Sequence, residues 1–317
     1  MLSPIDHPHT IIMHYKSTIT LAVMLLLMAA GITSVKAEDN LNYYDHAAMV
    51  EAATAKLRAY LKANPSVSAD SLRSNVINDL TDGPVGKARE LTPARKKKLT
   101  SAQVYDVAVR SSLIFGKMEH SDFIKSDSAY KTASAVALTP DGICATNYHV
   151  VADVILAGSL GRTNKNDEMR FLMDYEGNVY PVTAILAADP LNDWAIIKVD
   201  PCGHPLTPAP VGGDIPVGTP VYCLASPSGS HFHFTDGMVS NRTRTTNKRT
   251  GFTTYTLEIT SDYGVGASGG PIFDECGNLV ALVSSTFSLY AQPEQYRNFQ
   301  MAYKKTVPVF LIKECFK

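Results

Sequence analysis

The sequence predicts an all-β fold that follows an α-helical N-terminal extension. Two sets of short apolar segments, at residues 112–199 and 221–301, are interrupted by turns that contain Gly, Asn or Pro, as expected for the strands of a β-barrel. Residues 200–220 lie between the two sets and hold six prolines, which is typical of a connection between two barrels. Upstream, apolar residues recur at near-helical spacing through residues 38–63.

Composition and net charge narrow the classes of function. Of the 317 residues, 45% are hydrophobic and 19% are charged, so the chain can bury a core. The formal net charge of −1 gives no reason to expect a nucleic acid or an anionic membrane as a partner. The expected organisation is a leader at 1–37, a helical extension at 38–100 and one domain of about 200 residues at 101–317, with its internal junction near 200–212.

The leader has the pattern of a secretory signal peptide. Lys16 precedes an apolar run at 19–32, and small residues lead to Ala37. The run is too short to span a membrane comfortably, so we expect cleavage after Ala37 and a periplasmic or secreted protein without stable membrane insertion. An uncleaved anchor is the alternative, and Met13 is a second candidate start site.

The extension is expected to contain two short helices. The first lies within residues 38–63, and a capping serine begins the second at residues 68–80. The basic run at 95–98 is interpreted as a solvated linker rather than a polyanion site, because four charges are too few to indicate one. A further helix over 101–110 is expected to lead into the first strand.

Three polar residues stand beside apolar strands. His149 follows the apolar run that begins at Ile143, Asp193 directly precedes the apolar run 194–199, and Ser268 lies between glycines. A serine hydroxyl is a poor nucleophile until a base accepts its proton, and that base needs an orienting carboxylate. The chain order His, Asp, Ser is the order found in the chymotrypsin-type barrel.

The loop around Ser268 suits acyl transfer. Its glycines allow a tight turn, and the amides of Gly266 and Ser268 would form an oxyanion hole for a tetrahedral intermediate. A plain glycine-rich turn is the alternative for Ser268, and a core histidine satisfied by backbone groups is the alternative for His149. The ordered set of three favours the catalytic interpretation, because together the residues fit one mechanism.

These motifs resemble those of the trypsin-like serine endopeptidases of the HtrA type. The resemblance covers about residues 101–310 and implies two six-stranded antiparallel β-barrels of the chymotrypsin type. Two departures stand out: Ala267 replaces the usual Asn or Asp before the nucleophile, and no PDZ domain follows in this sequence. The matching segments are Thr146–Val151, Asp193–Ile196, Leu224–Gly229, Asp236–Ser240 and Gly266–Pro271.

The resemblance implies a serine endopeptidase with the triad His149, Asp193 and Ser268, which hydrolyses protein or peptide substrates through an acyl-enzyme and needs no metal or organic cofactor. Asp262 lies six residues before Ser268, where trypsin-like enzymes place the base of the primary pocket, and would there favour Lys or Arg in the substrate. HtrA-type relatives carry a structural aspartate near this point and tend to prefer small aliphatic residues, which is the alternative for Asp262. Two other functions stay open: a catalytically silent barrel that binds peptides or serves as a scaffold, and a non-peptide acyl hydrolase.

Cysteines and a histidine pair complete the candidates. The five cysteines are an odd number, so in an oxidising compartment at least one is free or pairs outside the chain. The resemblance makes Cys223 and Cys276 the candidate disulfide, and buried unpaired cysteines are the alternative. His231 and His233 could share one strand face and hold a metal, but without a third ligand we expect them on the substrate side or the surface.

Ala267 also bears on activation. In trypsin-like zymogens a new N-terminal amine pairs with the aspartate before the nucleophile, and a methyl group cannot hold that charge. We therefore expect removal of the leader to suffice for activity. The oxyanion loop would be ordered by its own hydrogen bonds, by docking of residues 38–100 or by substrate.

Overall fold

The structure is a computed structural model of the 317-residue chain. It divides into two compact units, Met1–Asp45 and His46–Lys317, and the description below concerns the second. The expected signal peptide and most of the second expected helix lie outside the described residues. The structure describes residues 43–65, 67–68, 71–72, 90–123, 125–160, 167–228 and 230–316.

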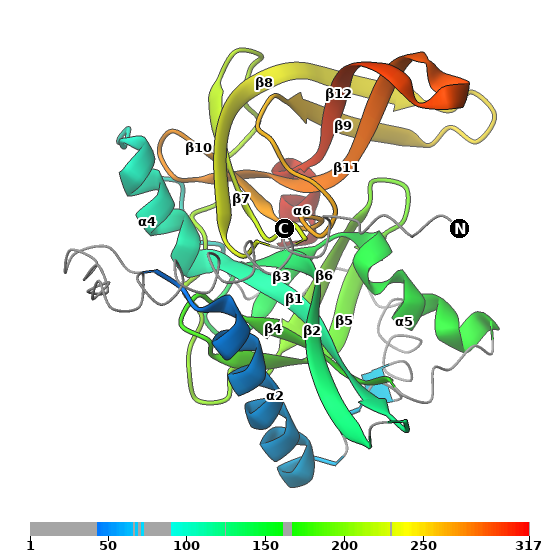
Figure 1. The fold of residues 1–317 in the computed structure, drawn as a ribbon. Coiled ribbons are helices and arrows are strands. Elements are labelled where there is room, and N and C mark those ends of the chain that lie inside the picture. Colours follow the sequence, from blue (N-terminus) through cyan, green and yellow to red (C-terminus); the bar gives the residue numbers. More distant parts are fainter. Residues whose placement is uncertain are drawn as a thin grey trace, which may run out of the picture. The chain divides into compact units, whose positions relative to one another are not determined.

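The first barrel closes from six antiparallel strands in the order β1-β2-β3-β6-β5-β4 (Figure 1). Its interior is filled by fully buried apolar side chains, such as Phe115, Leu172 and Ile197, so the barrel is a packed core. The strands are β1 Ser112–Ser121, β2 Ser126–Ala137, β3 Ile143–Thr146, β4 Asp167–Met173, β5 Val179–Asp189 and β6 Trp194–Val199.

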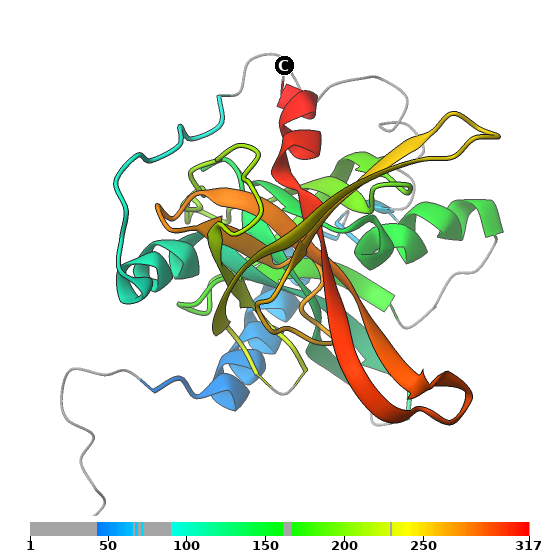
Figure 2. The ribbon, with the colours of Figure 1, turned by 90° about the horizontal axis from the view of Figure 1, so that it is seen from above.

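The second barrel also closes from six antiparallel strands, in the order β10-β11-β12-β9-β8-β7, which confirms the predicted all-β fold of two barrels. Val221, Ile272 and Val280 are among its core residues. Two hairpins, β8–β9 and β11–β12, project well beyond the barrel (Figure 2). The strands are β7 Pro220–Ala225, β8 His233–Thr246, β9 Thr253–Ile259, β10 Pro271–Asp274, β11 Leu279–Gln292 and β12 Arg297–Pro308.

Helices cover the outside of the barrels. Helix α2, His46–Ala63, packs on β2 and β5 and buries Ala53 and Leu57, while α4, Ser101–Ser111, begins with a capping box between Thr100 and Gln103. Both lie where helices were expected. The remaining helical segments are α5 Tyr148–Leu160, η1 Pro293–Gln295, α6 Val309–Lys313 and η2 Glu314–Phe316.

The segment before α4 runs extended along the second barrel. Asn278, in the β10–β11 turn, accepts a hydrogen bond from the Arg95 amide (2.6 Å) and donates one to the Arg95 carbonyl (3.0 Å). The amide of Leu99 bonds to the Glu275 carbonyl at 2.8 Å, and Lys98 pairs with the Glu275 carboxylate. The basic run therefore lies along the second barrel and ties the extension to it.

The five cysteines are all free thiols, so the candidate disulfide between Cys223 and Cys276 is wrong. Cys223 is buried within the second barrel and faces Ile272 in the strand register, whereas Cys276 lies beyond Asp274 in the β10–β11 turn. Strand geometry thus separates the two sulfur atoms, and the alternative of unpaired cysteines holds. Burial raises the pKa of the Cys223 thiol to about 12.

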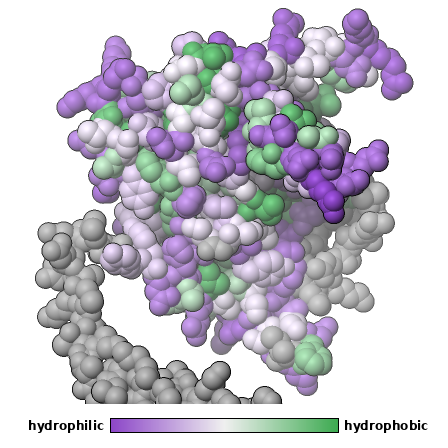
Figure 3. Space-filling view, turned by 45° about the horizontal axis from the view of Figure 1, so that its top comes forward, coloured by the Kyte–Doolittle hydropathy of each residue, from purple (hydrophilic) through white to green (hydrophobic). Residues whose placement is uncertain are grey.

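One face of the described surface is mainly polar. On the face drawn in Figure 3, hydrophilic residues predominate and hydrophobic residues form small separate patches. Within the described ranges, no helix combines the length and apolar character needed to cross a membrane.

Candidate active site

His149 is presented by the junction between β3 and α5. Strand β3 ends at Thr146, and α5 begins at Tyr148, so His149 lies in the first turn of the helix rather than at a strand end. Asn147 occupies the corner, where it is fully buried, and its Nδ2 donates a 2.8 Å hydrogen bond to the Asp193 carbonyl. This bond joins the two segments that carry the predicted histidine and aspartate.

His149 and Asp193 form a close pair. Nδ1 of His149 lies 2.9 Å from Oδ1 and 3.0 Å from Oδ2 of Asp193, and the backbone amide of His149 donates to Oδ1 at 3.1 Å. Asp193 has a φ of 56°, an uncommon value for a non-glycine residue, directly before β6. The structure therefore brings these two predicted residues together.

The Asp193 carboxylate is ionised at neutral pH. Burial alone would raise its pKa, but hydrogen bonds from the His149 imidazole, the Ser284 hydroxyl and the His149 amide outweigh burial, and the pKa lies below its usual range. An ionised carboxylate only accepts hydrogen bonds, so Nδ1 of His149 must be the protonated nitrogen. Nε2 is then left as an acceptor.

Ser284 is a site residue that the sequence interpretation missed. Its Oγ donates a 2.6 Å hydrogen bond to Oδ2 of Asp193. It follows the buried segment 279–283 of β11, at the point where the burial of that strand ends. A polar residue at the end of a buried run after the nucleophile loop was the available signal. Asn147, inside the quoted histidine motif, was missed in the same way.

Ser268 lies in a compact turn before β10. Within it, the amide of Ala267 donates to the Gly264 carbonyl (3.0 Å) and the amide of Gly270 donates to the Ala267 carbonyl (2.9 Å). Gly269 has a φ of 78°, and a Cβ there would lie 2.3 Å from the Ser134 carbonyl oxygen, so only glycine fits. The Ser268 carbonyl accepts a 2.8 Å bond from the Ser134 amide. The turn is therefore held from inside and from β2.

Ser268 and His149 line one cavity of about 260 Å³. In the part of the chain that the structure describes, no hydrogen bond joins the Ser268 hydroxyl to His149, and the amides of Gly266 and Ser268 donate to no protein group. Unbound active sites often show loose nucleophile–base geometry. Two free amides beside a serine are the arrangement that an oxyanion requires. Lys117, Thr132, Ala133, Val150, Asp153 and Arg170 complete the lining.

Asp262 lies apart from this cavity. Its carboxylate is 86% exposed, pairs with Lys304 Nζ at 3.0 Å and borders a separate groove of about 570 Å³. The neighbouring Tyr263 turns inward, and its hydroxyl bonds to the carbonyls of Ser285 (3.1 Å) and Lys305 (2.8 Å), which bridges β11 and β12. The inward position at this point of the loop thus belongs to Tyr263.

His231 and His233 do not form a shared site. His231 lies in a bend before β8, where its ring packs 4.5 Å from that of His46, whereas His233 is exposed at the start of the strand. Burial, together with the charges of His46 and Lys131, lowers the pKa of His231 to about 4. Among the described side chains, no cluster of three or more His, Cys, Asp or Glu residues could hold a metal ion.

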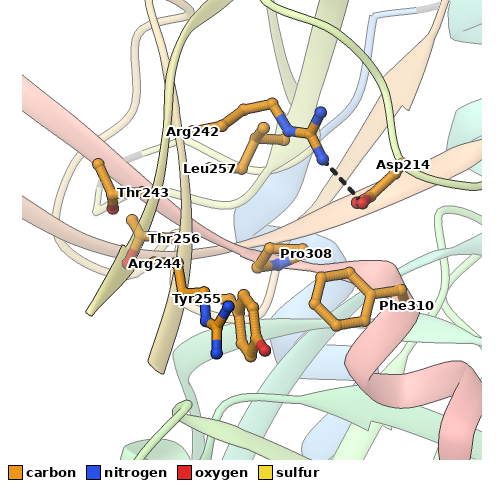
Figure 4. Close-up of a pocket in the computed structure, with 9 residues that line it drawn as sticks. All are labelled: Asp214, Arg242, Thr243, Arg244, Tyr255, Thr256, Leu257, Pro308 and Phe310. Atoms are coloured by element: carbon orange, nitrogen blue, oxygen red, sulfur yellow. Dashed lines mark hydrogen bonds and ion pairs between the residues drawn. The ribbon is translucent and has the colours of Figure 1, made fainter. Parts of the chain in front are cut away.

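A second cavity, of about 290 Å³, lies beside the β8–β9 hairpin (Figure 4). Arg242 reaches Asp214 at 2.8 Å on one side, and Tyr255 packs edge-on against Phe310 on another. The amide of Tyr255 donates to Asn192, the residue before Asp193, at 3.1 Å. None of the predicted site residues lines this cavity.

The comparison with known families agrees with this geometry. The family model described as "Trypsin-like peptidase domain" matches residues 133–282, which include His149, Asp193 and Ser268. This part of the chain is similar to a trypsin-like peptidase domain. The predicted resemblance is thereby confirmed.

Curated relatives carry protease names. The chain is 29% identical over 152 residues to "Protease Do-like 5, chloroplastic" of Arabidopsis thaliana, a match that covers 46% of each chain. It is 30% identical over 161 residues to "Probable periplasmic serine endoprotease DegP-like" of Pseudomonas savastanoi pv. phaseolicola, covering 49% of this chain and 29% of the relative. The match therefore spans less than half the length of these relatives.

Solved structures share much of this fold. "Crystal structure of Deg5" superposes with a TM-score of 0.50 at 21% identity and covers 67% of this chain and 90% of that one. "HtrA-type protease AlgW with decapeptide" superposes with a TM-score of 0.53 at 19% identity and covers 69% of this chain and 66% of that one. At these identities the likeness concerns the fold alone.

Proposed function

We propose that the protein is a serine endopeptidase of the periplasm or the secreted space. One observation carries the proposal: His149 is oriented by an ionised Asp193 and borders the same cavity as Ser268. The names of the curated relatives, which include a periplasmic serine endoprotease, support both the reaction and the compartment. A signal peptide at residues 1–37 is part of the same proposal.

The chemistry follows from the roles of the three side chains. Ser268 Oγ attacks the scissile carbonyl while His149 Nε2 accepts its proton, and the same proton then passes to the leaving amine. Asp193 holds the imidazole in the tautomer with Nδ1 protonated and stabilises the imidazolium. Water then attacks the acyl-enzyme, with His149 again as the base, and Ser268 is regenerated.

The developing oxyanion is received by backbone amides. The N–H groups of Gly266 and Ser268 lie on the same turn as the nucleophile and have no protein acceptor among the described residues. Such preorganised donors contribute to catalysis because they need no rearrangement when charge develops on the substrate.

Substrates are proposed to be proteins or peptides, with small aliphatic residues rather than Lys or Arg before the scissile bond. The carboxylate of Asp262 is neutralised by Lys304, and the adjacent inward position is filled by the ring of Tyr263. These contacts favour the structural alternative for Asp262 over a basic-residue pocket.

A fluorophosphonate probe tests the reaction. We expect covalent labelling of the wild-type protein at Ser268, no labelling of Ser268→Ala, and peptide turnover that falls by roughly 10⁴- to 10⁶-fold in that variant. Labelling that persists in Ser268→Ala, or turnover above a few per cent, would overturn the assignment. An ester-versus-peptide substrate panel separates the endopeptidase from a non-peptide acyl hydrolase.

A catalytically silent, peptide-binding barrel is the second candidate. The lack of a hydrogen bond between Ser268 and His149 in the described residues favours it. It predicts peptide binding without labelling or turnover in the wild-type protein, so the same probe distinguishes the two functions.

A further inference from the structure

The ammonium group of Lys131 is enclosed by backbone carbonyls of the opposite barrel. Nζ donates to the carbonyl oxygens of Ser226 at 2.5 Å and Ser230 at 3.2 Å, and also to that of Pro227. An ammonium group has three donors, so all three serve one loop. We call Ser226, Pro227, Ser228 and Ser230 the anchor loop.

A β-bulge allows strand β2 to reach this loop at two points. Phe115 of β1 faces Ala133, but the next residue, Gly116, faces Lys131, so Thr132 is an extra residue in β2. In a regular strand, side chains three positions apart lie on opposite faces, and an extra residue shifts that alternation. Lys131 and Ser134 accordingly both bond to the second barrel.

The anchor loop holds the oxyanion loop, residues 264–269. The Ser228 amide donates to the Val265 carbonyl at 2.7 Å. Ser134 Oγ accepts from the Ser226 amide at 3.0 Å and donates to the Gly266 carbonyl at 3.2 Å. A Cβ at Gly266 would lie 3.1 Å from the Ser226 carbonyl oxygen, so the two loops are in direct contact.

These bonds determine which way the Gly266 amide points. A trans peptide is planar, so the carbonyl of one residue and the N–H of the next point in opposite directions. Because the Val265 carbonyl is bonded to the anchor loop, the Gly266 N–H must point away from that loop. If the anchor loop moved, this peptide could rotate and the oxyanion hole would lose a donor.

We infer that Lys131 is a positioning residue for the oxyanion hole, which it orders through the anchor loop, so that no carboxylate is needed before the nucleophile. Ala267, which stands at that position, is fully buried among apolar side chains and could not pair with a cation. The catalytic use of the hole rests on the proposed function, but the ordering of the loop does not.

Helix α2 closes the same region from outside. The His46 ring packs on His231, the residue after Ser230, so the start of α2 contacts the end of the anchor loop. Burial lowers the pKa of Lys131 to about 8, which still leaves the side chain mostly protonated at neutral pH. A neutral amine has one donor fewer than the three carbonyls require.

Hydrogen exchange in the inactive Ser268→Ala background tests the ordering directly. We expect Lys131→Met to speed exchange of the Ser228 and Ala267 amides by about 10-fold or more, while strands of both barrels keep their protection. Lys313 is the matched control, since its Nζ also donates to a backbone carbonyl, that of Gly212 at 2.9 Å, far along the chain. Lys313→Met should leave both loops unchanged.

Kinetics of the active protein provide the second readout. Lys131→Met should lower kcat by about 10- to 100-fold with little change in KM, as expected when an oxyanion donor is lost. Lys131→Ala, which leaves space for a small cation, should show a similar loss, and methylammonium should restore part of its rate. The kcat of Lys131→Arg should lie between those of the wild type and Lys131→Met, because a planar guanidinium cannot converge on three carbonyls as an ammonium does.

Each outcome decides one question. Unchanged exchange in Lys131→Met would overturn the inference whatever the kinetics. Suppose instead that exchange is faster in Lys131→Met, while the wild-type protein is not labelled by the fluorophosphonate probe and does not cleave peptide. That result would uphold the ordering role of Lys131 and refute the proposed function. If Lys131→Met does not fold, Lys131→Arg keeps the positive charge but cannot reach all three carbonyls, and it should speed exchange of the same two amides to a smaller extent. Undiminished protection in that variant would also overturn the inference.

Discussion

Ser284 Oγ donates a 2.6 Å hydrogen bond to Oδ2 of Asp193, across the boundary between the two barrels. Asp193 precedes β6 of the first barrel, and Ser284 lies on β11 of the second. The carboxylate therefore receives hydrogen bonds from both barrels, on one side from His149 and on the other from Ser284. The orientation of the His149 imidazole depends on how the barrels are packed as well as on its own segment.

Replacing Ser284 with alanine tests this bond. At pH 7 we expect the free energy of unfolding to fall by about 1.5–3 kcal/mol, the range for hydrogen bonds to charged groups. The pKa of Asp193 is lower in the folded protein than in the unfolded chain. Ionised Asp193 therefore stabilises the fold at pH values above its unfolded-state pKa, and this stabilisation is lost as pH falls through its folded-state pKa. The deficit should thus shrink as pH falls through the folded-state pKa of Asp193, as measured by denaturant unfolding across pH. A deficit that is independent of pH would contradict the role given to the bond.

Asp193→Asn should lower kcat by roughly 10⁴-fold while KM stays similar, because an amide can hold the imidazole in the wrong tautomer. Steady-state kinetics with a peptide substrate measure the change. The control is Asp214→Asn, which removes only an exposed ion pair with Arg242. A loss within about 10-fold for Asp193→Asn would exclude this aspartate from the triad.

Specificity should not depend on Asp262. Its carboxylate is exposed and paired with Lys304, so Asp262→Ala should leave the ratio of kcat/KM for matched Arg, Val and Ala peptides within about 3-fold of wild type. We expect the Val and Ala peptides to be cleaved at least as well as the Arg peptide. A strong Arg preference that Asp262→Ala abolishes would instead support the basic pocket.

The N-terminus should not need a specific new amine. We expect equal initial rates for protein that begins at Glu38 and for the same protein with an N-terminal tag. Protein trimmed to Ser101 should be less stable, because it lacks α2 and the Thr100 cap of α4, a cap alone contributing about 1 kcal/mol. Activity that arises only on trimming, and disappears when the new amine is acetylated, would contradict this.

The alkaline limb of the pH–rate profile should report Lys131, whose pKa is about 8 against an ordinary 10.5. As pH rises through 8, the amine loses a donor to the anchor loop, so kcat/KM should decline. His231, with a pKa of about 4, and His46 are the other titratable groups at this loop. In Lys131→Arg, kcat/KM should no longer decline near pH 8. If the alkaline limb of the profile is unchanged in that variant, the decline belongs to another group.

The contribution of Lys131 to the free energy of unfolding should rise over the pH range in which kcat/KM declines. The folded chain releases the Lys131 proton at lower pH than the unfolded chain, so between about pH 8 and 10.5 the unfolded state binds more protons and this group adds stability as pH rises. Loss of activity without loss of stability would therefore distinguish local loosening from unfolding. Denaturant unfolding of wild type and Lys131→Met at pH 7 and pH 10 measures the difference.

The residues of the candidate triad could be chosen from local sequence. Short apolar runs bounded by Gly, Asn and Pro turns predicted the strands, and the three polar residues beside those runs followed in an order that suited one reaction. Asp193 and Ser268 lie where those patterns placed them, directly before β6 and in the turn before β10. His149 was displaced only from a strand end to the first turn of α5. Such features depend on neighbouring residues, so a single sequence contains them.

Contacts between distant segments could not be obtained in this way. Ser284 and Asp193 are 91 residues apart, and Lys131 and Ser226 are 95 apart, so no periodicity relates them. Cys223 and Cys276 illustrate the same limit, since strand register rather than spacing separates them. The chain by itself determined which groups can react and the strands that carry them. Closure and packing of the two barrels decided which groups meet, because only there do carbonyls, amides and side chains from remote segments satisfy one another away from water.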